Sequence, residues 1–207
     1  AGAAFAAEAS PYYFFHPAAA RRTAAALPEA RFVVMLRDPV ERTVSHWAEQ
    51  TRNGVETLDL SAALVAEPER LGDDLDRLRS GELATSHAHE QQSYAAQSEY
   101  ADSLQRWIDT AGRERIIVLF SEEYYRDPAT TIDTITAALG VAPMPPGLVG
   151  DHRNAAPRPG AIDPELERHL VERFRPDVAR LADIAGVTPP WPRFGLQPGA
   201  AAADTQP

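Results

Sequence analysis

Arginine and serine side chains between residues 31 and 47 occur in a pattern suited to holding a phosphate. Arg37 directly follows an apolar run, and Arg42 and Ser45 come shortly after it, with His46 beside them. A guanidinium donates paired hydrogen bonds to phosphate oxygens, and a serine hydroxyl adds a neutral donor. The segment therefore predicts an anion site. An ordinary strand-to-helix turn with a surface arginine is the alternative.

The neighbouring elements explain how these side chains would be positioned. Residues 32–36 form a short, valine-rich apolar run, which predicts a strand buried on both faces of a parallel sheet. Pro39 suits the first turn of a helix that continues to about Thr51, with Asp38 as its N-cap. A strand that leads directly into a helix places Arg37 at the carboxyl edge of the sheet, where open α/β folds bind ligands.

This segment resembles the 3′-phosphate-binding signature of sulfotransferases that use 3′-phosphoadenosine 5′-phosphosulfate (PAPS). The family pattern is a hydrophobic strand, Arg-Asp-Pro, two variable residues, Arg, two variable residues and Ser. The chain carries this pattern at Arg37, Asp38, Pro39, Arg42 and Ser45. By that resemblance, PAPS is the co-substrate, Arg37 and Ser45 bind its 3′-phosphate, and Arg42 supports the site.

Two further segments resemble the same family. Residues 8–13 read Glu-x-Ser-Pro-x-Tyr, an element that precedes the arginine-containing strand in the family, and a short strand with a tight turn at Ser10-Pro11 is expected. Residues 100–141 follow the family order Tyr-x3-Leu-x2-Trp, basic turn, buried strand, Glu-x4-Asp-Pro, helix, Leu-Gly-Val. This long segment predicts a helix to about Ala111 and a strand at 116–120. It indicates the fold, since none of its residues is an obvious catalyst.

The segments together predict one sulfotransferase-like α/β domain over residues 1–194. We expect the three-layer P-loop nucleotide-binding type, in which a parallel sheet is flanked by helices and strands 32–36 and 116–120 are adjacent. Residues 58–66 and 68–78 are expected to be helical, with their acidic side chains solvated. Residues 195–207 have the composition of a disordered tail.

A basic loop near the C-terminus is a second candidate for cofactor binding. In the family, such a loop folds over the nucleotide and helps to clamp its phosphate and adenine. The resemblance places Arg153, Asn154 and Arg158 in this role. A plain surface loop is the alternative.

Residues 80–97 show weak periodicity and predict a loop beside the acceptor cleft. His87, His89 and Tyr94 lie in it and are the candidate substrate-binding residues. The two histidines lack the spacing of a known ligand set, so no metal site is predicted.

Composition limits the possible classes of function. The net charge of −10 argues against nucleic-acid binding, which needs a basic surface, although local arginines can still form a positive pocket. Cysteine is absent, which excludes disulfides and thiolate metal sites. No apolar run approaches the length of a membrane span, and no secretory signal is visible. We expect a cytoplasmic protein; the oligomeric state stays open.

Two parts of a complete PAPS-dependent sulfotransferase are not found in these 207 residues. The family has a phosphosulfate-binding loop that carries a lysine, and this chain has no lysine. It also has an early glutamate or histidine as general base, so the catalytic residues are unknown here. We therefore expect an N-terminally incomplete domain that begins near the family's third strand. On its own, this chain is expected to show little or no sulfuryl-transfer activity. A degenerate, inactive protein is the alternative.

The resemblance implies a sulfotransferase that moves a sulfuryl group from PAPS to a hydroxyl or amine. A carbohydrate, glycolipid or small metabolite is the expected acceptor. A P-loop kinase-like enzyme shares the fold and is the alternative enzyme. A non-catalytic nucleotide- or glycan-binding module is the alternative from another class.

Overall fold

The computed structural model describes residues 6–145 and 161–196. Its strands are β1 (Phe32–Leu36) and β2 (Ile116–Phe120). Its α-helices are α1 (Pro11–Phe15), α2 (Ala19–Ala26), α3 (Pro39–Arg52), α4 (Leu60–Leu71), α5 (Asp74–Ser80), α6 (His87–Gln91), α7 (Ala101–Ala111), α8 (Ser121–Arg126), α9 (Pro128–Leu139) and α10 (Pro164–Ala185). Three 3₁₀ turns complete it: η1 (Ala96–Ser98), η2 (Arg113–Arg115) and η3 (Pro192–Phe194).

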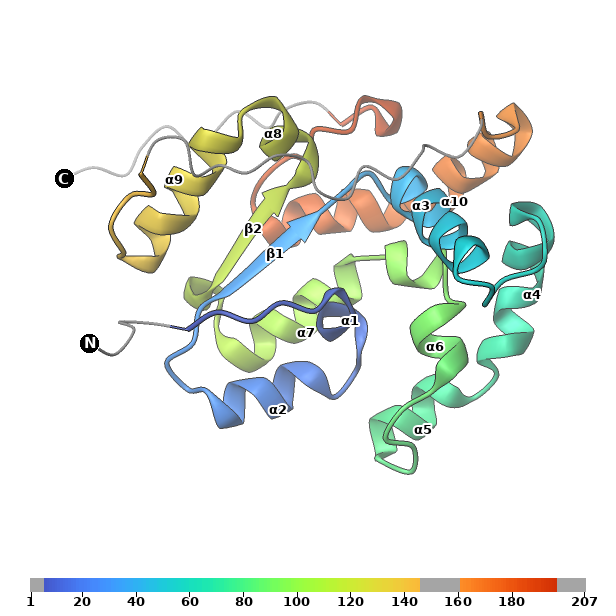
Figure 1. Ribbon diagram of the computed structural model, residues 1–207, viewed down its shortest axis with the longest axis horizontal. Helices are drawn as coiled ribbons and strands as arrows, with labels where there is room; N and C mark the ends of the chain where they lie inside the picture. Colours follow the sequence, from blue (N-terminus) through green and yellow to red (C-terminus); the bar gives the residue numbers. More distant parts are fainter. Residues whose placement is uncertain (1–5, 146–160, 197–207) are drawn as a thin grey trace.

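The two strands are parallel neighbours, which confirms the predicted pairing. Their register runs from Phe32 opposite Ile116 to Leu36 opposite Phe120. A parallel pair needs a long crossover, and the chain from α3 to α7 supplies it (Figure 1). Both strands end at the same edge of the sheet, where β1 leads into α3 and β2 into α8.

Helices cover the sheet from both sides, as expected for the three-layer α/β class. On one face, Val34 and Leu36 join the hydrophobic core with α7 and α10, whose Leu104 and Phe174 are completely buried. On the other face, Leu119 is buried where α8 and α9 contact β2. Helices α3 to α6 lie beside this unit (Figure 1).

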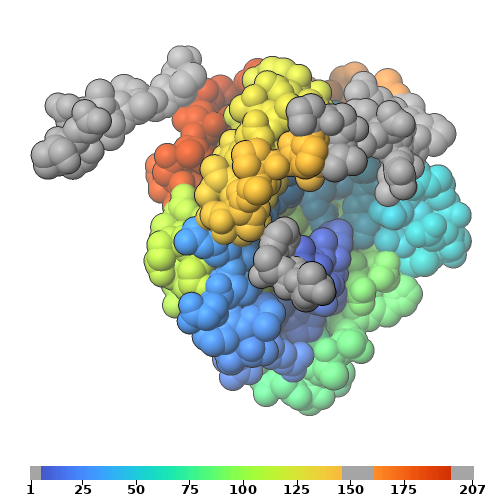
Figure 2. All heavy atoms as spheres, turned by 60° about the vertical axis from the view of Figure 1, so that its left-hand side comes forward, coloured from blue at the N-terminus to red at the C-terminus, as the bar shows by residue number. Residues whose placement is uncertain are grey.

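The prediction that β1 is buried on both faces is wrong. Val33 and Met35 are 41% and 43% exposed, whereas Val34 and Leu36 on the other face are buried. Successive strand residues point to opposite faces, and α9 on this side packs mainly on β2. Helices α2 and α9 lie on opposite sides of β1 in Figure 1, and both are in view on one face of the molecule in Figure 2.

Three other segments differ from the sequence-based expectation. Residues 6–10 form no strand, and Ser10-Pro11 instead begins helix α1, because proline is accommodated in the first turn of a helix. Helix α4 continues through Pro68 to Leu71, and Gly72 is its C-cap. The predicted loop at 80–97 contains helix α6, capped by the Ser86 side chain, and the turn η1.

Some predictions concern residues outside the described ranges. Arg153, Asn154 and Arg158 belong to this group, as does most of the predicted tail, from residue 197 onward. Among the described helices, none is long and apolar enough to cross a membrane.

Candidate phosphate-binding site

The candidate site begins at the junction of β1 and α3. The Asp38 side chain caps α3, because its Oδ1 accepts hydrogen bonds from the Val40 and Glu41 amides at 3.0 and 3.2 Å. Pro39 occupies the first helical position, where a missing N–H costs nothing. The predicted cap is confirmed, and it places Arg37 at the carboxyl edge of the sheet.

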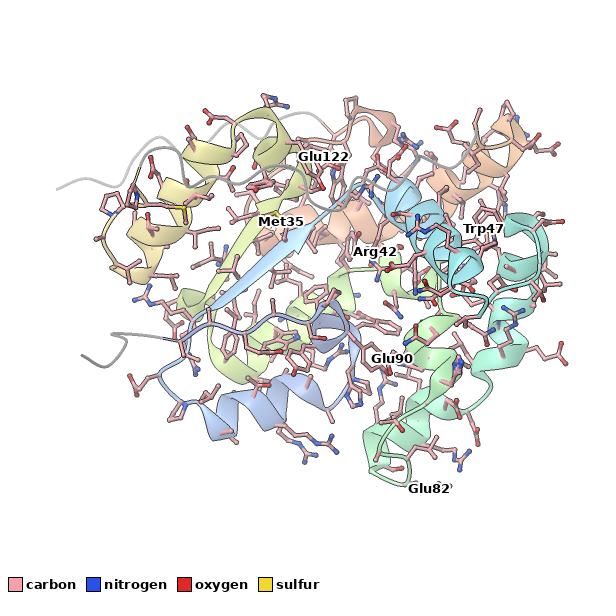
Figure 3. The ribbon with its side chains drawn as sticks, viewed as in Figure 1. Met35, Arg42, Trp47, Glu82, Glu90 and Glu122 are labelled. Atoms are coloured by element: carbon pink, nitrogen blue, oxygen red, sulfur yellow. The ribbon has the colours of Figure 1, made fainter. Side chains whose placement is uncertain are left out.

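Two distant residues hold this junction in place. The Tyr100 hydroxyl, before α7, donates to the Arg37 carbonyl at 2.9 Å. The Asp38 amide donates to Oε1 of Glu122, in α8, at 2.8 Å. Figure 3 shows Glu122 near the point where β1 leads into α3. Both contacts use the backbone of the junction, so they fix its path without occupying the Arg37 side chain.

The side chains of Arg37 and Ser45 are both partly exposed among the described residues. The Arg37 side chain is 37% exposed, and its guanidinium makes one polar contact within the described residues, to Glu41 Oε2 at 3.4 Å. Ser45 is half-buried on α3. Its position, eight residues after Arg37, places it along the helix from the junction.

Arg42 lies beneath this surface and is bonded only to neutral groups. Its Nη2 donates to Gln97 Oε1 at 2.6 Å and its Nη1 donates to Ser98 Oγ at 3.4 Å. Burial lowers the pKa of Arg42, although a guanidinium keeps its charge in proteins. No carboxylate of the described residues lies within ion-pair distance of it. A partly buried cation whose hydrogen-bond partners are neutral favours an anion nearby.

Helix geometry brings two of the predicted residues together. Arg42 and Ser45 are three residues apart in α3, so they lie on the same side of the helix. Figure 3 shows Arg42 on α3. With Arg37 at the start of this helix, the arrangement can accept an anion between the strand end and the first two turns.

Two of the predicted acceptor residues lie in the interior rather than on a cleft. Tyr94 is completely buried, and its hydroxyl donates to Glu56 Oε2 at 2.8 Å. His89 is 1% exposed; its Nδ1 shares a hydrogen bond with the Tyr12 hydroxyl at 2.8 Å, and Phe15 stacks on its ring. Burial lowers the pKa of His89 to about 4. Both side chains thus have their polar partners inside the protein, and direct contact of either with the acceptor stays a prediction.

His87 is exposed and lines a shallow surface hollow of about 570 Å³ between the end of α3 and α6. The hollow is mainly polar and is lined by Gln50, Asn53, Val55, Thr85, Ser86, His87, Glu90 and Gln91. Amide, hydroxyl and carboxylate groups of this kind can form hydrogen bonds with sugar hydroxyls. Figure 3 marks Glu90, which belongs to α6. Among the described residues, no group of three histidine or acidic side chains could hold a metal ion.

Sequence reasoning missed the contribution of Tyr100 and Glu122 to the site. Both had a signal, because they begin the Tyr-x3-Leu-x2-Trp and Glu-x4-Asp-Pro patterns. The patterns indicated the fold, but the contacts join residues 63 and 84 positions apart, which spacing within one element does not reveal.

Comparison with known proteins points to one family. The model of the sulfotransferase family matches residues 1–146. The chain is similar to a solved sulfotransferase from Alicyclobacillus acidocaldarius, with 31% identity and a TM-score of 0.67. That similarity covers 84% of this chain and 62% of the solved one.

Two longer relatives were also found. They are the bifunctional heparan sulfate N-deacetylase/N-sulfotransferase 1 of Caenorhabditis briggsae and the corresponding protein 3 of Homo sapiens. Each is 25% identical to this chain, over 142 and 137 residues respectively. The aligned parts cover 67% and 66% of this chain but only 15% and 14% of the relatives.

Proposed function

Because the chain belongs to the sulfotransferase family, we propose that its parent protein transfers a sulfuryl group from PAPS to a hydroxyl or amine. The observation that carries this proposal is that the β1–α3 junction has a fixed backbone and an arginine side chain with few contacts. Its backbone is held by Tyr100 and Glu122, while the Arg37 guanidinium has only one long polar contact among the described residues. Such a group is free to bind a phosphate.

In this proposal, Arg37 donates paired hydrogen bonds to the 3′-phosphate of PAPS, and the Ser45 hydroxyl adds a third donor. Arg42 contributes positive charge beneath the site, where bonds to Gln97 and Ser98 hold its guanidinium. Arg153, Asn154 and Arg158 remain proposed nucleotide contacts. PAPS itself supplies the activated sulfuryl group.

For the acceptor, we favour a carbohydrate or another glycan-bearing molecule. The names of the two longer relatives state action on heparan sulfate, and the hollow beside His87 offers polar side chains to hydroxyl groups. A glycolipid or small hydroxylated metabolite fits the same chemistry. A cytoplasmic location stays part of the proposal.

Calorimetric titration with adenosine 3′,5′-bisphosphate, adenosine 5′-monophosphate and ATP tests the cofactor. We expect the bisphosphate to bind most tightly, because only it presents a 3′-phosphate to Arg37 and Ser45. Preference for ATP would favour the kinase-like alternative. Equal affinity for the two adenosine phosphates would refute the assignment of the site.

A further inference from the structure

Arg193 lies beside the proposed phosphate site although it comes late in the chain, in η3. Its Nε contacts Asp38 Oδ2 at 3.0 Å, and its Nη2 contacts Glu41 Oε1 at 3.4 Å. A third contact joins its Nη1 to Glu167 Oε1 of α10 at 3.0 Å. One guanidinium therefore faces three carboxylates, two of which, those of Asp38 and Glu41, lie at the start of helix α3.

The turn that carries Arg193 is firmly held. Trp191 is 2% exposed and packs edge-on against Phe120 at the end of β2, with ring centroids 5.4 Å apart. Arg175 of α10 donates to the Phe194 carbonyl at 2.9 Å. The Arg193 side chain itself is only 28% exposed. It is thus positioned before any ligand arrives.

Glu41 is shared between two arginines. Its Oε1 faces Arg193 and its Oε2 faces Arg37, each at 3.4 Å. Glu41 is half-exposed and can turn toward either cation. Its contact with Arg37 competes with any phosphate for the same N–H donors. Because Arg193 shares the negative charge of Glu41, Glu41 holds the Arg37 guanidinium less tightly than it would alone.

Asp38 depends on the same arginine. Burial raises the pKa of Asp38, and the Arg193 charge and the two capping amides act against that rise. Without Arg193, the negative charges of Asp38 and Glu41 would stand beside Arg37 with less compensation. Both effects would weaken binding of an anion there.

We infer that Arg193 is a positioning residue for 3′-phosphate recognition: it holds Asp38 and Glu41 and shares their negative charge, so that Arg37 exchanges its weak contact with Glu41 for the phosphate more readily. This inference rests on the proposed function. Arg193 lies outside residues 1–146, which the family model matches, so the comparison with the family does not assign it this role.

The test measures dissociation constants of the chain for adenosine 3′,5′-bisphosphate and adenosine 5′-monophosphate. Arg193→Gln is expected to weaken bisphosphate binding about threefold to tenfold, and to leave monophosphate binding within about twofold. Arg193→Lys is expected to retain part of the effect. Arg180→Gln is the matched control, because it also removes one arginine of a surface ion pair, with Asp102.

Substitution of Glu41 distinguishes positioning from mere stabilisation. Glu41→Gln removes the competitor of the phosphate, so we expect bisphosphate binding about twofold to fivefold tighter, even if Arg193→Gln fails to fold. The double variant is expected to return to within about twofold of wild type. Unchanged or weaker binding by Glu41→Gln, or equal loss of both ligands by Arg193→Gln, would overturn the inference. A wild-type chain that ignores the 3′-phosphate would instead refute the proposed function, and the inference with it.

Discussion

Replacement of Arg37 by alanine is the most direct test of the site. In the free protein, this change removes one exposed ion pair with Glu41, since the Arg37 carbonyl that binds Tyr100 belongs to the backbone. The free energy of unfolding is therefore expected to change by less than about 0.5 kcal/mol. A loss of ligand binding can then be attributed to the side chain rather than to misfolding.

The magnitude follows from the contacts that Arg37 can exchange. A charge-assisted hydrogen bond contributes about 1.5–3 kcal/mol, and giving up Glu41 on binding costs at most about 1 kcal/mol. Two such bonds, less that cost, give a net loss of about 2 kcal/mol or more in Arg37→Ala. Affinity for adenosine 3′,5′-bisphosphate is therefore expected to fall about thirtyfold to more than a hundredfold.

Calorimetry with the bisphosphate and with adenosine 5′-monophosphate reads out this effect. The monophosphate lacks the group that Arg37 binds, so its affinity is expected to change little. Arg52→Ala is the matched control, because Arg52 is exposed in the last turn of the same helix and the change alters the net charge equally. If Arg37→Ala weakened both ligands equally, Arg37 would be structural and the assignment wrong.

The remaining predictions concern one further ligand contact and two features of the interior. Ser45→Ala is expected to cost about 1 kcal/mol of bisphosphate affinity by calorimetry, and no change would remove Ser45 from the site. Burial alone would raise the pKa of Glu56, but bonds from Arg70, two backbone amides and Tyr94 outweigh it and lower the pKa to about 2. Arg70→Ala leaves this buried carboxylate short of its cation, so urea unfolding is expected to show a loss of about 2–4 kcal/mol; a loss below about 1 kcal/mol would contradict that reasoning. The folded-state pKa of His89, about 4, lies below its ordinary value of 6.5, so the unfolded chain binds the proton more readily. This contribution to stability is complete above about pH 6.5 and is lost as pH falls to about 4, by about 3 kcal/mol. His89→Gln is expected to flatten the dependence of unfolding free energy on pH, and an unchanged slope would assign it to other groups.

The sequence predicts the local features of this protein well. Residues 32–36 and 116–120 form strands at the predicted bounds, because continuous valine- and isoleucine-rich runs favour extended chain between turns. Asp38 caps α3 as expected, since the cap and the helix it serves lie within four residues of each other. These features depend on neighbours in sequence, and a single sequence contains that information.

Features that depend on distant partners were not predictable in this way. Tyr94 was expected at a cleft because its segment is polar, yet the carboxylate of Glu56, 38 residues earlier, satisfies its hydroxyl in the interior. Val33 and Met35 were expected to be buried because the run is apolar, but burial of a second face requires an element packed on it. The three ion pairs of Arg193 leave no local trace, since Asp38 is 155 residues away.

The charge balance at the junction explains how an acidic chain can present an anion site. The chain carries a net charge of −10, and four carboxylates lie near the start of α3. Part of their negative charge is compensated: Asp38 accepts from two amides and pairs with Arg193, which also pairs with Glu41 and Glu167. The guanidinium of Arg42 meets only neutral acceptors, and Arg37 meets one weakly held carboxylate. Positive potential therefore remains where the strand ends, because local pairing rather than net charge determines which ligand a surface favours.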